Sequence, residues 1–299
     1  MNKTIKYILV LAAAITALMA EGCSGKKTST PEGDDPWSWR KEEQQNDPQP
    51  FVTKTYYPKA TGSFRLMTYN VGAFAKYMTD STPIIADMIK EVEADLVGLN
   101  EVDSCNTRHN VNQAAVLAKS VGDWQWSYGR AMAYRNGAYG NAVIVPSGSK
   151  IVSSYTVTLA KGVGSEQRSI AVIETDKFVY GSCHLDHTSE AAQLAQVQIV
   201  NAWAQSKYLD CGKPVFFGGD MNATPESQTI SALCGSWDLL SETALSYPST
   251  GPSKCIDYIF HYKKSAPVKV IGSKVMTQFY NGNPSQTSDH LPVYVDVQF

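Results

Sequence analysis

The chain has 299 residues, of which 43% are hydrophobic, and a formal net charge of −2. This length and apolar content allow one large core or two small ones, and no internal repeat indicates a solenoid. The slight excess of acid disfavours non-specific binding to nucleic acid, because such binding depends on Lys and Arg that neutralise phosphates. A nuclease is not excluded by this argument.

The N-terminus predicts a signal peptide over residues 1–22. Lys3 and Lys6 precede the apolar run "YILVLAAAITALMA", which is too short to span a bilayer comfortably. The run ends at "AEGC" and resembles a bacterial lipoprotein signal, with Cys23 as the acylated first residue of the mature chain. An ordinary secretory signal with an incidental cysteine is the alternative. We therefore expect an exported protein anchored to a membrane through Cys23, on the periplasmic or the cell-surface side.

The segment after Cys23 predicts a flexible tether over residues 23–62. Its sequence "SGKKTSTPEGDDPWSWRKEEQQNDPQP" is rich in Pro, charged residues and small polar residues. Such a composition does not bury enough apolar surface to fold by itself. We therefore expect the folded domain to cover residues 63–299.

The first part of that domain alternates between strand-like and helix-like patterns. Residues 64–71 (FRLMTYNV) and 95–102 (DLVGLNEV) predict strands. Between them, "TPIIADMIKEVEA" places its Ile, Met and Val side chains on one helical face, and Pro83 suits the first turn of a helix. The stretch "VNQAAVLAKSVG" predicts a second helix, which ends at Gly122.

The rest of the domain is richer in strands. "WQWSYGR" and "GNAVIV" are strand-like, and "SIAVIETDKFVYGSCHLD" predicts a hairpin that turns near Asp176 and Lys177. A longer helix is expected from about Ser189 to Lys207, with Glu190 near its positive end. Four further strands are predicted in "PVFFGG", "CIDYIFHY", "PVKVIGSKV" and "PVYVDVQF". Many strands and few helices favour sheets packed on each other with helices outside, an α+β arrangement.

The cysteines after the signal do not form a recognisable framework. They are Cys105, Cys183, Cys211, Cys234 and Cys255. None belongs to a Cys-x-x-Cys pair, so a structural zinc site is not indicated. An exported protein can form a disulfide, but the sequence does not say which residues would pair. Buried free thiols are expected for most of them.

Polar residues stand where the predicted strands end. A turn explains a lone Asn or Asp, and a satisfied core group explains a lone His. Asp257 resists this explanation, because it lies in an apolar strand and a buried carboxylate needs a partner. Strand ends commonly converge on one edge of stacked sheets, so we expect one polar site. Its members are Asn70, Glu101, His184, Asp220, Asn222, Asp257, Asp289 and His290.

Short motifs around these residues resemble those of a known family. "TYN", "LNEV", "YGNAV", "EQRS", "CHLDH", "GGDMNATP", "CIDYIF" and "SDHLPV" occur in the order and at roughly the spacing of the endonuclease/exonuclease/phosphatase family, which includes pancreatic deoxyribonuclease. The resemblance covers about residues 63–299. It implies an α/β four-layer sandwich, in which two mixed β-sheets lie face to face with helices on both outer sides.

Residue types suggest how such a site would hydrolyse a phosphate ester. Asp220 and Asn222 are two apart on a segment expected to be extended, so their side chains should point to the same side. The resemblance implies that Asp220 orients or deprotonates the attacking water and that Asn222 holds the phosphate. Glu101 is the best candidate for a direct ligand of Mg²⁺ or Mn²⁺, which prefer a few oxygen ligands. The resemblance adds Asn70 and Asp289 as helpers.

The family pattern also pairs Asp257 with His290, which would fix the ring tautomer and keep the imidazole cationic. His184 would lie on the other side of the phosphate, as a donor or as the acid for the leaving group. The resemblance further places Asn141 and Arg168 against the phosphate, whereas a turn Asn and a surface Arg are the ordinary readings. Other nearby polar residues are expected in loops (Asp186 and His187) or at the surface (His109 and His261).

We therefore predict a divalent-metal-dependent phosphoesterase that acts by metal-assisted attack of water. The fold does not define the substrate. The absence of a long basic run favours a small or lipid-like phosphodiester or phosphomonoester over bulk nucleic acid. Two alternatives remain: a secreted or surface nuclease, and a non-catalytic surface binding protein on the same fold. We expect a monomer.

Overall fold

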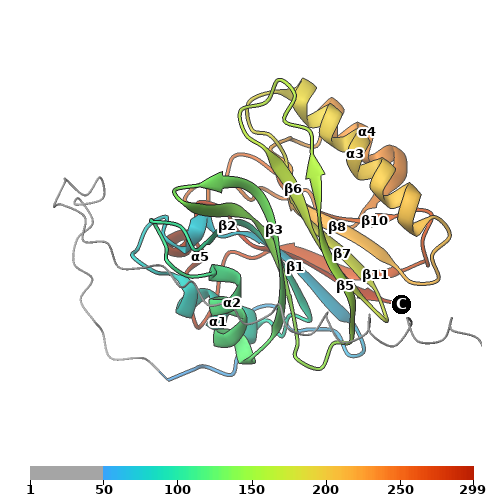
Figure 1. Cartoon of the computed structure of the whole chain (residues 1–299). Coiled ribbons are helices and arrows are strands. Elements are labelled where there is room, and N and C mark those ends of the chain that lie inside the picture. Colours follow the sequence, from blue (N-terminus) through green and yellow to red (C-terminus); the bar gives the residue numbers. More distant parts are fainter. Residues whose placement is uncertain (1–49) are drawn as a thin grey trace, which may run out of the picture. The chain divides into compact units, whose positions relative to one another are not determined.

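The computed structural model describes residues 50–299, so the predicted signal peptide, Cys23 and most of the predicted tether lie outside the described residues. The strands form two sheets of six strands each. Figure 1 shows the two sheets face to face, with α1 and α2 on the side of one sheet and α3 and α4 on the side of the other. None of the described helices has the length and apolar character needed to cross a membrane.

The first sheet has the strand order β11-β12-β1-β2-β4-β3. Strands β1 and β2 are parallel, whereas every other neighbouring pair in this sheet is antiparallel. The sheet is therefore mixed. Its strands are β1 (Phe64–Asn70), β2 (Leu96–Ser104), β3 (Gln125–Tyr134), β4 (Gly137–Val145), β11 (Lys269–Val275) and β12 (Val293–Gln298).

The second sheet has the order β5-β6-β7-β8-β10-β9 and also contains one parallel pair, β7 with β8. The predicted hairpin near Asp176 and Lys177 is present as the antiparallel pair of β6 and β7. Its strands are β5 (Ile151–Leu159), β6 (Arg168–Thr175), β7 (Val179–His184), β8 (Val215–Asp220), β9 (Trp237–Leu239) and β10 (Asp257–Tyr262).

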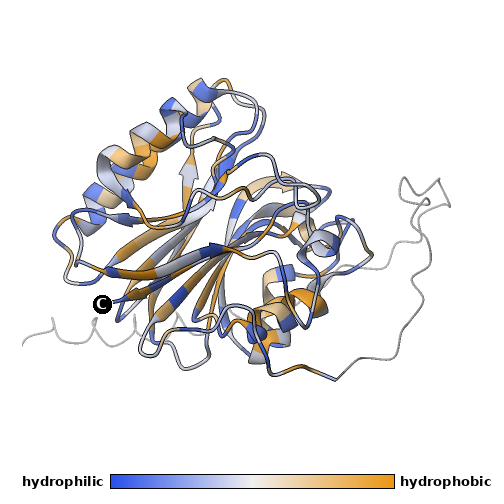
Figure 2. Cartoon of the chain, turned by 180° about the vertical axis from the view of Figure 1, so that it is seen from behind, coloured by the Kyte–Doolittle hydropathy of each residue, from blue (hydrophilic) through white to orange (hydrophobic). Residues whose placement is uncertain are grey.

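Helices cover the outer face of each sheet. The first sheet carries α1 (Thr82–Glu91) and α2 (Gln113–Gly122), and the second carries α3 (Glu190–Tyr208) and α4 (Gln228–Ser236). Side chains cap the first turns of three of them: Asn112 for α2, Ser189 for α3 and Ser227 for α4. Figure 2 shows both apolar and polar residues along these helices, as expected where one face packs on a sheet. A short 3₁₀ turn, η1 (Gly72–Phe74), and a short helix, α5 (Pro284–Thr287), complete the set.

Three apolar clusters make up the layers of the core. One lies between the first sheet and its helices, and another between the second sheet and its helices. The third lies between the two sheets, where Leu66 and Val143 of one sheet meet Ile173 and Phe216 of the other. The predicted four-layer sandwich is confirmed.

Some elements differ from the sequence-based expectation. Strand β5 was not predicted; its residues alternate between exposed and half-buried, as at the edge of a sheet. The short elements α4, β9 and α5 were also not predicted. His261 was predicted at the surface, which is wrong: it is 5% exposed, and its Nε2 donates to the Ala266 carbonyl at 2.9 Å. His109 is half-buried and lies 2.6 Å from a carboxylate oxygen of Asp103.

The end of the predicted tether packs on the domain. Val52 and Asn281 exchange two hydrogen bonds, of 2.7 and 2.8 Å, and Tyr56 stacks on Tyr280 with ring centroids 4.3 Å apart. The Tyr57 carbonyl accepts a hydrogen bond from Arg65 at 2.7 Å. Residues from about 52 onward therefore belong to the folded unit. Among the described cysteines, Cys183, Cys211, Cys234 and Cys255 are free thiols.

Candidate active site

Strand register brings the polar strand ends together. In the first sheet, Asn70 at the end of β1 lies beside Asn100 of β2, and Glu101 follows directly. In the second sheet, Asp220 at the end of β8 lies between His184 of β7 and Asp257 of β10. The carboxyl ends of the two parallel pairs thus meet at one edge of the sandwich, as the sequence predicted.

These residues line a cavity of about 660 Å³. Seven of the residues predicted for the site are in its wall: Glu101, Arg168, His184, Asp220, Asn222, Asp289 and His290. Asn70 and Asp257 lie behind them and are buried. Carboxylates and potential cations therefore line one cavity, as is typical of a functional site.

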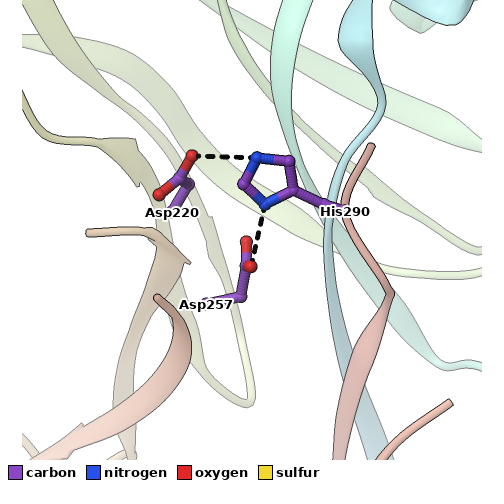
Figure 3. A group of neighbouring side chains, drawn as sticks. All are labelled: Asp220, Asp257 and His290. Carbon is purple, nitrogen blue, oxygen red and sulfur yellow. Dashed lines mark hydrogen bonds and ion pairs between the residues drawn. The ribbon is translucent and has the colours of Figure 1, made fainter. Parts of the chain in front are cut away.

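Asp257, His290 and Asp220 form a buried relay (Figure 3). His290 Nδ1 donates to Asp257 Oδ2 at 2.9 Å, and His290 Nε2 lies 3.5 Å from Asp220 Oδ2. Burial opposes a charge on the ring, but the carboxylates of Asp257 and Asp220 outweigh it and raise the pKa of His290 to about 10. His290 is therefore an imidazolium at neutral pH, held between two carboxylates.

Asp220 is held so that it can accept a proton. Burial raises the pKa of Asp220 to about 7, despite the positive charge of His290. Its Oδ1 accepts a hydrogen bond from the backbone N–H of Asn222 at 2.8 Å, and its Oδ2 accepts one from Asn70 Nδ2 at 3.1 Å. A carboxyl group with a pKa near neutrality is suited to general base catalysis.

Asn222 reaches the cavity by a different route from the one predicted. The segment after β8 is not extended, because Asn222 has a φ of 48° in the left-handed region. Its Nδ2 donates to the Leu185 carbonyl at 3.1 Å, which fixes the plane of the carboxamide. The two side chains share the cavity because the chain turns there. Gly219 assists, since a Cβ at this position would lie 1.8 Å from the Cys183 carbonyl oxygen.

His184 and Arg168 carry donors that lack partners. Burial, with the nearby charge of Arg168, holds the pKa of His184 well below its ordinary value, so the ring is neutral. Its Nδ1 and the Nε of Arg168 are buried without a hydrogen-bond partner among the described residues. Both predicted roles of His184, as a donor to phosphate and as the acid for the leaving group, stay predictions.

Glu101 is directed into the cavity by a break in the strand. The pairing of β2 with β4 shifts register between Leu99 and Val102, and Glu101 within this bulge has a φ of 58°. Such strain in a non-glycine residue is typical of functional positions. Asn70 Nδ2 lies 3.2 Å from Glu101 Oε1 and donates to it, while its Oδ1 accepts from Gly72 N–H. Asn70 therefore orients Glu101, and its role as a helper at the metal stays a prediction.

The acidic wall fits a hard cation. Lys76 Nζ lies 2.6 Å from Asp289 Oδ2. Burial opposes the charge of this ammonium, yet Asp289 and Glu101 together raise the pKa of Lys76. An oxygen-rich pair that already attracts a cation suits Mg²⁺ or Mn²⁺. The relay of Asp220, Asp257 and His290 also clusters within 4.8 Å, but a protonated His290 offers no lone pair to a metal.

Three polar residues near the site remain, and only Asn141 lies where the sequence did not place it. Asn141 was predicted to face phosphate, but its Oδ1 accepts from Asn100 at 2.9 Å and its Nδ2 donates to the Ser169 carbonyl at 2.8 Å. It is 1% exposed and joins the two sheets below the cavity. Asp186 lies in a loop as predicted, yet it is fully buried and accepts hydrogen bonds around the start of α3. His187 lies at the cavity wall, 3.0 Å from Arg168 Nη2.

The fold and this set of residues agree with a comparison to known proteins. The profile of the Endonuclease/Exonuclease/phosphatase family matches residues 67–290. The chain belongs to this family. The match spans the site from β1 to His290, and the family consists of hydrolases that act on phosphate esters.

Individual relatives of the family are distant. The uncharacterized protein YbhP of Escherichia coli K12 is 28% identical over 174 residues, which are 54% of this chain and 67% of YbhP. Mannosyl-6-phosphatase Bt3783 of Bacteroides thetaiotaomicron aligns with a TM-score of 0.64 at 18% identity, over 79% of this chain and 100% of that chain. The catalytic domain of human Nocturnin aligns at 0.61 and 18% identity, over 80% and 94%. At these identities the likeness to solved structures shows the fold alone.

Within this family fold, sequence reasoning missed several supporting residues. Asn100 donates to the Cys183 carbonyl at 2.8 Å and accepts from the Asp220 N–H at 2.9 Å, so it ties the two halves of the site together. Ser246 Oγ donates to Asp257 Oδ2 at 2.6 Å. Tyr139 lies in the cavity wall beside Glu101. The "LNEV" and "YGNAV" motifs contain Asn100 and Tyr139, and their position beside predicted site residues was the available signal.

Proposed function

We propose that this protein is a divalent-metal-dependent phosphoesterase that hydrolyses a small phosphorylated molecule. One observation carries the proposal: a buried Asp220 with a pKa raised to about 7 shares a cavity with the cationic groups of Arg168 and His290. A base poised near neutrality beside fixed positive charges is what the attack of water on an anionic phosphorus requires.

The residues divide the work as follows. Asp220 accepts a proton from the water whose oxygen attacks phosphorus, and the P–O bond to the alcohol breaks. His290 and Arg168 stabilise the charge on the phosphoryl oxygens, and Asp257 holds His290 in its cationic form at 2.9 Å. His184 and Asn222 donate hydrogen bonds to the same oxygens. The departing oxygen takes up a proton from solvent, and Asp220 returns its proton to solvent. The net reaction consumes one water and releases the alcohol together with phosphate, or with a phosphomonoester when the substrate is a diester.

Glu101 and Asp289 are the residues that would hold Mg²⁺ or Mn²⁺. Such an ion would supply electrostatic stabilisation of the negative charge that develops in the reaction. Asn70 keeps Glu101 turned toward the cavity through the contact of 3.2 Å. Hydrolysis should stop in chelator and return with Mg²⁺ or Mn²⁺, and Glu101→Gln should weaken Mn²⁺ binding in a calorimetric titration. Full activity in chelator would remove the metal from this proposal.

A panel of phosphate esters tests the function directly. It should contain phosphomonoesters, phosphodiesters, sphingomyelin and plasmid DNA, each with and without Mg²⁺. Sugar phosphates belong in it because the structural neighbour Bt3783 is a mannosyl-6-phosphatase. We expect turnover of small esters and little of plasmid. Comparable rates on plasmid and small diesters would favour the nuclease alternative, and no turnover of any ester would favour a binding protein.

We also propose that the mature chain is exported and anchored through Cys23, from the "AEGC" signal. Several lipid chains on one cysteine would hold a protein firmly, whereas a single chain binds a membrane only marginally. Cys23→Ser should move the protein from the membrane fraction to the soluble exported fraction with hydrolysis unchanged. A wild-type protein already soluble after export would contradict the anchor.

A further inference from the structure

A second cavity adjoins the one that contains the relay. Its volume is about 540 Å³, within the usual range of ligand pockets of about 300–1,000 Å³. Glu101, Tyr139 and Glu166 line both cavities, so the two meet at this shared wall. The far wall of the second cavity comes from the β3–β4 hairpin and from the loop after η1, through Met132 and Tyr77. No step of the proposed reaction uses this space.

The second cavity lies next to the carboxylates of the site, where a departing alcohol could enter it. Asn70 Nδ2 lies between the two carboxylates of the site, 3.1 Å from Asp220 Oδ2 and 3.2 Å from Glu101 Oε1. Water activated at Asp220 approaches phosphorus from that side, and in-line displacement expels the leaving oxygen on the opposite side. Glu101 lines both cavities, so a leaving oxygen that departs on its side would enter the second cavity.

The charged groups of the second cavity are already paired. Arg108 makes two hydrogen bonds to Asp103, of 2.7 and 2.9 Å. Lys76 is 2.6 Å from Asp289. Glu166 is 3.2 Å from Arg168 Nη2. Among the described residues, Lys76 is thus the one cation of this wall that a metal at Asp289 would release, and Arg108 keeps its carboxylate partner.

The rest of the wall suits a ring. Tyr134 and Tyr139 lie with their ring centroids 6.0 Å apart, and the guanidinium of Arg108 stands over the Tyr134 ring at 4.9 Å. Met132 and a half-exposed Tyr77 complete the wall. Aromatic faces bind the flat apolar face of a ring, while charged edges such as those of Arg108 and Glu166 pair with hydroxyl groups. The combination of ring faces and hydrogen-bonding edges is what a polyhydroxylated ring matches.

We propose that the second cavity binds the leaving-group alcohol, and that this alcohol is a neutral sugar ring, either free or as part of a nucleoside. The proposal rests on the phosphoesterase function and narrows its substrate. A lipid chain fits less well, because it would cover the charged groups of Lys76, Glu101 and Arg108 without replacing their water. A nucleic-acid strand fits less well because its further phosphates would need unpaired cations.

The test compares phosphates that differ only in the alcohol: glycerol 3-phosphate, glucose 6-phosphate and adenosine 5′-monophosphate. The wild type should prefer at least one ring compound over the glycerol ester by about tenfold in kcat/KM, as expected for roughly 1.4 kcal/mol of ring contact. Met132→Trp should fill the cavity and lower kcat/KM for the ring esters much more than for the glycerol ester, which removes the preference. Tyr134→Ala should weaken it mainly through KM, and Tyr56→Ala, a stacked tyrosine outside both cavities, is the matched control.

A ring preference that survives both Met132→Trp and Tyr134→Ala overturns the proposal while hydrolysis itself stands. The glucose and adenosine arms decide between a free sugar and a nucleoside. A separate readout does not depend on turnover: saturation-transfer NMR with methyl glucoside and with adenosine. Contact in the wild type that is lost in Met132→Trp supports the cavity assignment, and no contact with either ring overturns it. If no ester is hydrolysed, the proposed function fails, and the NMR result still judges the cavity.

Discussion

Arg65 and Arg168 are both buried at the beginning of strands, at 0% and 2% exposure, yet their surroundings differ. Arg65 Nε and Nη2 donate to the two carboxylate oxygens of Asp296 at 2.7 and 2.6 Å. Its Nη1 donates to the carbonyls of Tyr57 and Val92 at 2.7 Å. Each nitrogen of this guanidinium has an internal partner, so Arg65 is complete without any ligand.

Arg168 is incomplete by the same measure. Its Nη2 contacts His187 and Glu166 at the cavity wall, and its Nε is buried without a partner. Among the described residues, the His184 Nδ1 of the same site also lacks a partner, as does the carboxylate oxygen Oδ1 of Asp257, an acceptor. An unsatisfied buried donor costs folding free energy. We infer that the fold tolerates this cost at the cavity because a ligand supplies the missing acceptor.

The largest expected effect concerns the site around Arg168, where buried polar atoms lack partners among the described residues. Asp220→Asn removes the proposed base while preserving the shape of the side chain, so kcat/KM should fall by about 10³–10⁴-fold. Stability should hold or rise, because a buried carboxyl group with a raised pKa is removed. Steady-state kinetics and thermal melts measure the two quantities. If Asp220→Asn lowers stability as well as activity, Asp220 supports the fold in the way that Arg65 does.

Arg65→Met should lower the stability of the fold. Asp296 would remain buried without its cation, and breaking a buried pair in this way costs roughly 3–5 kcal/mol. The free energy of unfolding in urea measures this loss. The double variant with Asp296→Leu is the control, since it removes the stranded carboxylate and should recover part of the stability. An unchanged midpoint for Arg65→Met would contradict the view that this pair supports the fold.

Arg168→Met should give the reverse pattern. The side-chain volume is kept, and the orphaned Nε is lost, so stability should change by less than about 1 kcal/mol. Removal of a fixed donor to the phosphoryl oxygens should lower kcat/KM by about 10²–10³-fold. Arg168→Lys should restore little, because Lys lacks the planar fork of Arg. Wild-type turnover in Arg168→Met would place the phosphate elsewhere.

The relay allows a finer comparison. Asp257→Asn would turn an N–H toward His290 Nδ1, and His290→Ala removes the ring; each should cost on the order of 10²-fold in turnover. The double variant should be little worse than either single one, because groups that act as a unit are not additive. Turnover of one ester at saturating Mg²⁺ is measured for all four proteins after thermal melts have verified folding. Multiplicative losses would mean that the two residues act independently.

Local sequence patterns predicted most of the fold and the membership of the site. Asn70, His184 and Asp220 could be identified because each ends a strand with a clear apolar pattern. The orientation of the side chains could not be predicted, because it depends on strand pairing across distant segments. The bulge that turns Glu101 inward arises from its register with β4. Likewise, the carboxamide of Asn141 is used by Asn100 of the neighbouring strand.

The contacts of residues outside the motifs could not be predicted from the sequence, because they too depend on distant segments. Lys76 follows the motif of β1 in a loop, and only the folded chain brings its ammonium to Asp289. His261 lies in β10, whose residues are all buried, and its Nε2 donates to the carbonyl of Ala266. An isolated His is predicted at the surface because most polar side chains are exposed, but a His with a hydrogen-bond acceptor nearby can be buried.

The smallest expected effect is a pH dependence of stability. The pKa of Asp220 is raised to about 7 in the fold, against about 3.9 for a free Asp, so the folded state holds more protons between these values. Its contribution to stability is therefore present below pH 4 and is lost as pH rises through 7. His290, with its pKa raised to about 10, adds a slope of the same sign only above its unfolded value of about 6.5.

Melts between pH 4 and pH 6 therefore isolate Asp220, because His290 is protonated in both states there. The wild type should lose roughly 5–9 °C relative to Asp220→Asn over this range, from about 2.3 kcal/mol of linkage and about 2–4 °C for each kcal/mol in a domain of this size. Chelator keeps divalent cations from competing with protons, and the difference between the two proteins cancels the other carboxylates. Arg65→Met provides a second control. Because Arg65 and Asp296 lie apart from Asp220, the Asp220→Asn change should alter the pH dependence of stability by the same amount in the wild type and in Arg65→Met. If the wild type instead gains stability relative to Asp220→Asn as pH rises, the fold stabilises Asp220 as a carboxylate. Asp220 would then resemble Asp296, which Arg65 holds as a carboxylate.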